Sequence, residues 1–379
     1  MDFWDPDDTL EDRAERFLRS QAVLVASAVL AVASMFLVPP SWGYADYIDV
    51  RTLCILFCFM AVVAGLKKCN VFKILAQRIL GGSRSVTVLC LLLVLLPFFC
   101  AMFITNDVAL LTFVPFAILV LRMAKRSDLI VPVVVLQTVA AILGSMSIPF
   151  GNAQNLYISS NYDVGMAEFF SVMLPLTLVG LVVVVALSLR FGRDRVSIEF
   201  EKTYALKHRK LLAVSVVLFV LCVASVLRWV PYQVTIVLTV ASILLVRPKT
   251  LLKVDYGLLL TMAFMFVFAG NMAQIDAVRQ VFGDLISWDP TVTAMALSQV
   301  TSNMPASVLL SEFTTDWQGL LAGIGVGGFG TPIASMASIV SLRIYMREER
   351  DGPGRYLRHY TAVNVLMLLV LAPIAIVMV

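Results

Sequence analysis

Charge is scarce in this chain. Only 14% of its 379 residues are Asp, Glu, Lys or Arg, whereas 60% are hydrophobic. Soluble globular chains carry about 25% charged residues. The composition therefore excludes an ordinary soluble domain and indicates a polytopic membrane protein embedded in the lipid bilayer. The Lys and Arg residues form no aromatic-interleaved basic surface, so we expect no nucleic-acid partner.

Patterns for metal binding and catalysis are also missing. The six cysteines show no pair with disulfide or metal-site spacing. The two histidines, His208 and His359, fall among basic loop residues. No nucleophile and base stand in a recognisable arrangement. We therefore expect no enzyme, no cofactor and no metal apart from a sodium ion. Na⁺ or H⁺ remains a candidate coupling ion.

The N-terminus lacks the features of a signal peptide. Met1 to Arg19 is acidic and then basic, whereas a signal peptide has a short basic start and an apolar core. This stretch indicates a cytoplasmic lead-in or an interfacial helix.

Apolar runs predict an all-α membrane protein with nine transmembrane helices. Two of the nine are interrupted, at Gly144 to Asn152 and at Gly325 to Pro332, where Gly and Pro do not favour regular helix. The nine predicted spans cover residues 22–38, 52–65, 131–159, 166–189, 211–227, 234–246, 256–269, 317–344 and 361–379.

The basic residues predict the orientation of these spans. Loops rich in Lys and Arg face the cytoplasm, and with nine spans this rule places the N-terminus inside and the C-terminus outside. The exceptions on the outside are Arg51, Arg228 and Arg279, all near interfaces. The expected location is the inner (plasma) membrane of a bacterium.

Two further apolar segments are divided by short polar tips. Asp107 lies between the uncharged runs Val86 to Phe103 and Val108 to Leu121. Thr301-Ser302-Asn303 divides Pro290 to Val300 from Pro305 to Phe313. The second pair of arms is too short to cross a bilayer, which needs about twenty helical residues, and this predicts a re-entrant hairpin. The first pair is longer. We infer re-entry there by analogy, and two full spans remain the alternative.

The order of these elements predicts an inverted repeat. A span, an amphipathic stretch, a hairpin, a broken helix and a final span occur twice, separated by an odd number of crossings. Inverted repeats with discontinuous helices are typical of secondary transporters, whose site lies at the membrane midplane. We divide the chain into scaffold segments 1–84 and 193–286 and transport segments 85–192 and 287–379.

The four interruptions supply the candidate site. Helix N-termini suit an anion, and unwound carbonyls suit a hard cation. Asp107 could bind a cation, carry a proton, or simply cap the following helix. An acidic side chain this deep in apolar sequence usually marks an ion or substrate path. The candidate substrate ligands are Asn106, Asn152, Asn155, Ser302, Asn303, Thr331 and Pro332, and the candidate cation ligands are Thr105, Asp107, Gly151, Thr301 and Ser335.

Four segments carry a resemblance to the ion transporter superfamily, with its citrate-transporter-like, arsenite-permease-like and divalent anion/sodium symporter branches. The segments are residues 103–115, 149–155, 301–306 and 327–335. The resemblance implies a scaffold domain and a moving transport domain, an elevator mechanism and a homodimer. The divalent-anion branch carries Ser-Asn-Thr at both tips, whereas Thr105-Asn106-Asp107 and Ser302-Asn303-Met304 stand here.

These observations lead to one main hypothesis and two alternatives. The main hypothesis is a secondary active transporter that couples a small anion, a carboxylate or an inorganic oxyanion, to sodium or protons. Because Asp107 resembles the arsenite-permease and sodium/proton antiporter branches, a sodium/proton antiporter or arsenite-type efflux permease is the first alternative. An ion channel is the second.

Overall fold

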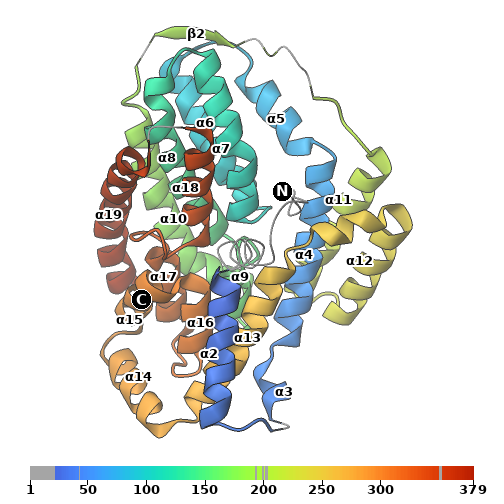
Figure 1. The fold of residues 1–379 in the computed structure, drawn as a ribbon, viewed down its shortest axis with the longest axis vertical. Helices are drawn as coiled ribbons and strands as arrows, with labels where there is room; N and C mark the ends of the chain where they lie inside the picture. The colour runs from blue at the N-terminus through green and yellow to red at the C-terminus, as the bar shows by residue number, and fades with distance from the viewer. Residues whose placement is uncertain (1–21, 42, 193, 199, 201–203, 350–351) are drawn as a thin grey trace, which may run out of the picture.

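The structure is a computed structural model that describes residues 22–41, 43–192, 194–198, 200, 204–349 and 352–379. The interpretation of Met1 to Arg19 lies outside these residues. The fold is helical, as predicted, with one short two-stranded ribbon (Figure 1). In the first half the elements are α2 (Ala22–Leu37), α3 (Tyr44–Tyr47), α4 (Val50–Lys68), α5 (Val71–Leu80), β1 (Gly82–Ser85), α6 (Val86–Ala101), α7 (Asn106–Met123), η1 (Ser127–Leu129), α8 (Ile130–Met146), α9 (Ala153–Asn161) and α10 (Met166–Ser188).

The second half begins with the other strand of the ribbon. Its elements are β2 (Arg195–Ile198), α11 (Arg209–Val226), α12 (Tyr232–Val246), η2 (Pro248–Lys253), α13 (Tyr256–Ala273), α14 (Asp276–Trp288), α15 (Pro290–Thr301), α16 (Asn303–Ser311), α17 (Trp317–Gly327), α18 (Met336–Glu348) and α19 (Pro353–Met378).

Polar side chains fix where several of these helices begin. Asp49, Asp255, Asp289 and Asp316 each accept a hydrogen bond from the backbone N–H three residues later, at 2.9–3.1 Å. Ser85 does the same for α6 at 3.3 Å. Such caps satisfy N–H groups that have no partner inside the helix. The apolar runs between caps then continue as helix.

Seven of the described helical segments are long and apolar enough to cross a membrane. They are α4, α7, η1–α8, α10, α11, α13 and α19. The prediction of nine spans is not tested by this count, because it also included shorter and interrupted helices. The arms of the second hairpin, α15 and α16, have 12 and 9 residues and reach only about 18 and 14 Å. The bilayer core is about 30 Å thick.

The two hairpins make equivalent contacts with the two broken helices. α8 packs on α6 and α7 of the first hairpin, and α17 packs on α15 and α16 of the second. The second half of each broken helix contacts the opposite hairpin: α9 contacts α16, and α18 contacts α7. In Figure 1 α18 accordingly lies beside α7, and α9 lies near the lower helices. α10 and α19 contact both α8 and α17 and complete this bundle.

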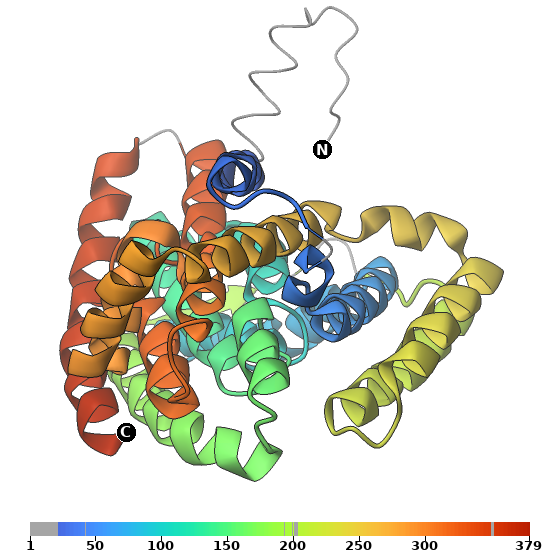
Figure 2. The ribbon, with the colours of Figure 1, turned by 90° about the horizontal axis from the view of Figure 1, so that it is seen from below.

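The other helices lie along one side of the bundle. α4 packs against α11 and α12, which project away from α19 in Figure 2. α13 packs on α2 and reaches both α4 and α16. α4 also contacts α9. These contacts bring the candidate scaffold helices against the hairpins.

A buried glutamine supplies a hydrogen bond that a proline removes from the first hairpin. Pro97 lies inside α6 and lacks the N–H that would bond the carbonyl of Leu93, four residues earlier. The Gln137 amide of α8 donates to that carbonyl at 2.8 Å. Gln137 is fully buried. The packing of α6 on α8 therefore includes one polar contact, from Gln137 to the Leu93 carbonyl, in an otherwise apolar core.

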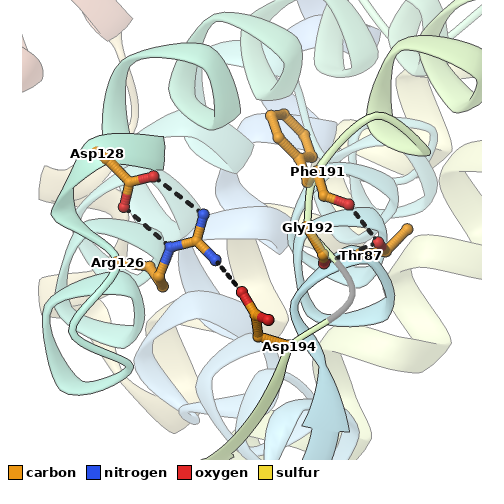
Figure 3. A network of polar contacts seen from close by, with 6 residues as sticks. All are labelled: Thr87, Arg126, Asp128, Phe191, Gly192 and Asp194. Carbon is orange, nitrogen blue, oxygen red and sulfur yellow. Dashed lines mark hydrogen bonds and ion pairs between the residues drawn. The ribbon is translucent and has the colours of Figure 1, made fainter.

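A polar network holds the segment after α10 against the first hairpin (Figure 3). Arg126 donates to both carboxylate oxygens of Asp128 at 3.0 Å and lies 3.5 Å from Asp194. The Thr87 hydroxyl donates to the carbonyls of Phe191 and Gly192. Strand β2 then pairs antiparallel with β1. The ribbon departs from the predicted all-α fold because the two connections between the predicted scaffold and transport segments run side by side here.

Candidate functional site

The N-termini of four helices meet at one cavity of about 60 Å³. Each terminus belongs to a different interruption: α7 and α16 follow the hairpin tips, and α9 and α18 follow the breaks. Leu258 of α13 also lines the cavity. The cavity is lined by Thr105, Asn106, Asp107, Asn152, Ala153, Gln154, Leu258, Ser302, Asn303, Met304, Ser335 and Met336.

The convergence of N-termini determines the electrostatics of the cavity. The start of a helix carries about half a positive charge from its unpaired N–H groups. Among the described residues no Lys or Arg lines this cavity, and Asp107 is the only one in its lining with a formal charge. The site is therefore one of backbone dipoles and amides, with a single carboxylate among them.

The first tip presents an unpaired carboxylate oxygen. Thr105 occupies the N-cap position of α7, so Asp107 lies inside the first turn and is not the cap residue that one of its interpretations required. Its Oδ1 is buried and has no hydrogen-bond partner among the described residues. The neighbouring Asn106 accepts the backbone N–H of Asp107 at 2.9 Å through Oδ1.

The second tip is strained and tightly fitted. Ser302 has φ 75° and ψ 154°, a region that is essentially reserved for glycine. It is held there because Asn303 N–H and the Ser302 hydroxyl both donate to the carbonyl of Ala334, at 3.0 and 3.3 Å. The buried Asn303 Oδ1 has no partner among the described residues. A Cβ on Gly328 would lie only 2.7 Å from Asn303 Nδ2, so only glycine at this position leaves room for the Asn303 amide as it stands.

Asn155 clamps the first break. Its side chain is fully buried, and Nδ2 donates to the carbonyls of Met146 and Ile148 at 3.1 and 3.2 Å, with Ser145 at 3.5 Å. Carbonyls freed by a broken helix need such donors inside a membrane. Asn152 in turn caps α9 by accepting Asn155 N–H at 2.9 Å.

Gln299 clamps the second break in the same manner. Its Nε2 donates to the carbonyls of Gly327 and Phe329 at 2.8 and 3.0 Å. Its Oε1 accepts the N–H of Thr331 at 2.9 Å, and the Thr331 hydroxyl donates back to the Gln299 carbonyl at 2.9 Å. Two amide side chains thus donate hydrogen bonds to unwound carbonyls of the kind that the sequence analysis considered as cation ligands.

The predicted site residues divide into two groups. Those that line the cavity are Thr105, Asn106, Asp107, Asn152, Ser302, Asn303 and Ser335. Those that do not line it are Gly151, Asn155, Thr301, Thr331 and Pro332. In the second group the polar contacts are structural: the Thr301 hydroxyl donates to the carbonyl of Leu297 at 3.1 Å. A Cβ on Gly151 would lie 2.1 Å from the Ser145 carbonyl oxygen, which leaves no room for a side chain.

Several residues of the site were missed from the sequence. Leu258, Met304 and Met336 resemble any apolar residue in a membrane helix. Gln299 carried the one usable signal, because it is a polar side chain two positions before the second tip.

A larger cavity of about 490 Å³ adjoins the site. It shares Thr105, Asp107 and Leu258 with the tip cavity. Lys67, Lys68 and Lys253 line its other walls, with Asp255. The α7 terminus, with Thr105 and Asp107, therefore lines both cavities, whereas the other three helix ends line only the smaller one.

The family model described as Citrate transporter matches residues 13–337, so the chain belongs to the citrate transporter family. An uncharacterized transporter of Methanocaldococcus jannaschii is 29% identical over 311 residues, which cover 80% of this chain and 84% of that protein. The inner membrane protein YbiR of Escherichia coli is 28% identical over 316 residues, covering 81% and 82% of the two chains. The family and these relatives support a membrane transporter, in agreement with the superfamily resemblance.

Proposed function

We propose that this member of the citrate transporter family is a secondary active transporter of a small anion, a carboxylate or an inorganic oxyanion. Sodium or protons would be the coupling ion. The observation that carries the proposal is the meeting of four helix N-termini at one cavity. Such termini bind anions through free N–H groups and the helix dipole.

The coupling follows from Asp107. A bound anion and an ionised Asp107 would repel each other in the same cavity, because both are negatively charged. A proton or Na⁺ on the unpaired Oδ1 removes that repulsion. Anion and cation would then bind together more favourably than either alone, which is the requirement for cotransport.

In this proposal Asn106, Asn152, Ser302, Asn303 and the α18 terminus at Ser335 contact the anion. Asp107 and Thr105 contact the cation. Asn155 and Thr331 act behind the site through the clamps. Gly151, Thr301 and Pro332 shape the chain around it.

The transport cycle is proposed as an elevator. The two hairpins and broken helices, with α10 and α19, form one packed bundle that would move against α2, α4 and α11 to α13. The hairpins would be re-entrant, the N-terminus cytoplasmic, the C-terminus outside, and the protein a homodimer of a bacterial inner membrane.

A sodium/proton antiporter or arsenite-type efflux permease is the second candidate, and the lone carboxylate favours it. If Asp107 exchanges cations without an anion, the helix ends serve only to stabilise its charge. The two candidates differ in whether an anion is needed for ion flux.

Transport by purified protein in liposomes tests the proposal. We expect labelled citrate uptake to rise when a sodium or proton gradient is imposed, and Asp107→Asn to lose that dependence. Asp255→Asn is the matched control, because it also removes a carboxylate from the adjoining cavity while asparagine still caps α13.

Two results contradict the proposal. Gradient-driven citrate uptake that is unchanged in Asp107→Asn would refute the coupling role of Asp107. Dissipation of a pH gradient by sodium alone, with no response to citrate, sulfate or arsenite, would select the antiporter.

A further inference from the structure

Two of the three arginines that break the positive-inside pattern meet in space. Arg279 has a local function, since its guanidinium donates to the carbonyl of Ala273 at 2.6 and 3.1 Å, at the end of α13. Arg51, at the start of α4, and Arg228, just after α11, line the same cavity instead. Their separation in the sequence gave no sign of this meeting.

This cavity is separate from the tip cavity. It has a volume of about 180 Å³ and shares no lining residue with the tip cavity or with the basic cavity beside it. Arg51 and Lys67 lie near opposite ends of α4, about 24 Å apart along its axis. The two-arginine cavity therefore opens at the other end of the scaffold from the lysines.

The charges of the cavity are not balanced. Arg228 forms an ion pair with Asp163, from the loop between α9 and α10. Arg51 has no ion pair or hydrogen bond within the part of the chain that the structure describes. Burial and the nearby charge of Arg51 lower the pKa of Arg228. Only the guanidinium of Arg228 therefore pairs with the carboxylate, and the positive charge of Arg51 has no counter-charge among the described lining residues.

One residue of the cavity wall also carries a buried hydroxyl group without a partner. Ser159 lines the cavity, is 7% exposed, and its Oγ has no hydrogen-bond partner among the described residues. A buried hydroxyl without a partner is unfavourable. The start of α10, at Gly165 and Met166, forms another wall of the cavity.

We propose that this cavity is a second anion-binding site, in which the guanidinium groups of Arg51 and Arg228 and the hydroxyl of Ser159 bind a carboxylate or oxyanion of the transported class. The identity of the anion rests on the proposed function. The bound anion takes the place of Asp163 on Arg228, because guanidinium binds carboxylates and oxyanions through paired hydrogen bonds. Since Ser159 and Asp163 belong to the α9–α10 side and the arginines to α4 and α11, the anion bridges the two parts of the molecule.

Chemical modification of a cysteine in the cavity tests the site without using transport. Ser160 lines the cavity and is partly exposed. Ser160→Cys would be placed in a Cys54→Ala background, because the other five cysteines are buried. The rate of its reaction with the anionic reagent MTSES and the cationic reagent MTSET is measured with and without citrate or sulfate.

We expect MTSES to react faster than MTSET, and citrate or sulfate to slow both reactions. Arg51→Gln and Arg228→Gln should each weaken this protection about tenfold or more, the effect of losing a charged hydrogen-bond partner. The corresponding Lys variants should retain part of it. Asp163→Asn should strengthen protection, because the competing carboxylate is gone. Arg279→Gln is the matched control and should change nothing.

The remaining outcomes overturn the site or separate it from the transport proposal. Protection that is absent, or equal in wild type and both Gln variants, refutes the site, as does weaker protection in Asp163→Asn. Asp107→Asn should leave protection intact. A chain that shows protection but no anion transport would retain this site and lose the proposed function.

Discussion

Replacing Asn155 by leucine decides whether this residue holds the first break or contacts the substrate. The sequence suggested a substrate ligand, whereas the structure buries the side chain completely and directs its amide to the carbonyls of Met146 and Ile148. Leucine has a similar size and no donor. The substitution therefore removes the clamp and leaves the packing nearly filled.

The expected loss of stability follows from these contacts. Two buried carbonyls lose donors at 3.1 and 3.2 Å, and each unsatisfied carbonyl is unfavourable by about 1–3 kcal/mol. Asn155 Oδ1 has no partner in the described structure, so its removal returns about 1–3 kcal/mol. The net change in the free energy of unfolding is about 2 kcal/mol of destabilisation.

Unfolding in mixed SDS and detergent micelles measures this change, and stabilisation by citrate measures binding. Asn303→Ala is the contrasting control, because Asn303 lines the cavity and its Oδ1 is unpaired. It should weaken citrate binding, and the free energy of unfolding should fall by less than about 1 kcal/mol. The clamp argument is wrong if Asn155→Leu unfolds like wild type yet no longer binds citrate.

Two further predictions concern positions where the structure shows a specific fit. Gln137→Leu removes the donor to the Leu93 carbonyl but also the unpaired Gln137 Oε1, so the free energy of unfolding should change by less than about 1 kcal/mol. Pro97→Ala supplies the missing N–H and should therefore stabilise Gln137→Leu by about 1–3 kcal/mol more than it stabilises wild type in the same unfolding assay; equal effects in the two backgrounds would refute the explanation. Gly328→Ala places a Cβ 2.7 Å from Asn303 Nδ2, the movable end of a side chain. It should therefore weaken citrate binding about tenfold with little loss of stability; unchanged affinity would show that the Asn303 amide is not positioned by Gly328.

The two clamps follow one physical rule. Each broken helix leaves carbonyls without donors in a region that contains little water, and each is supplied by an amide side chain. Asn155 comes from the helix that follows its own break, whereas Gln299 comes from the neighbouring hairpin. The positions of these amides in the sequence differ, although their task is the same.

Much of the helical fold could be read from local patterns. Apolar runs ended by Asp, Ser, Gly and Pro located most helices and both breaks, because a membrane helix must satisfy its backbone internally and only a few residues permit an interruption. The ribbon of β1 and β2 could not be found in this way. It depends on two connections, 110 or more residues apart, lying side by side at the register of Gly82 with Ile198.

For the site, the sequence determined which segments interrupt the helices and which polar residues they carry. Tertiary structure decided which end of each helix faces the cavity. All four ends are N-termini, whose partial positive charge favours an anion, whereas free carbonyls favour a cation. Tertiary structure also directed the Asn155 and Thr331 side chains to backbone carbonyls and brought Arg51 and Arg228 to one cavity. Composition and spacing fix what each short segment can do, but the direction in which its dipoles and side chains point depends on packing between segments far apart in the chain.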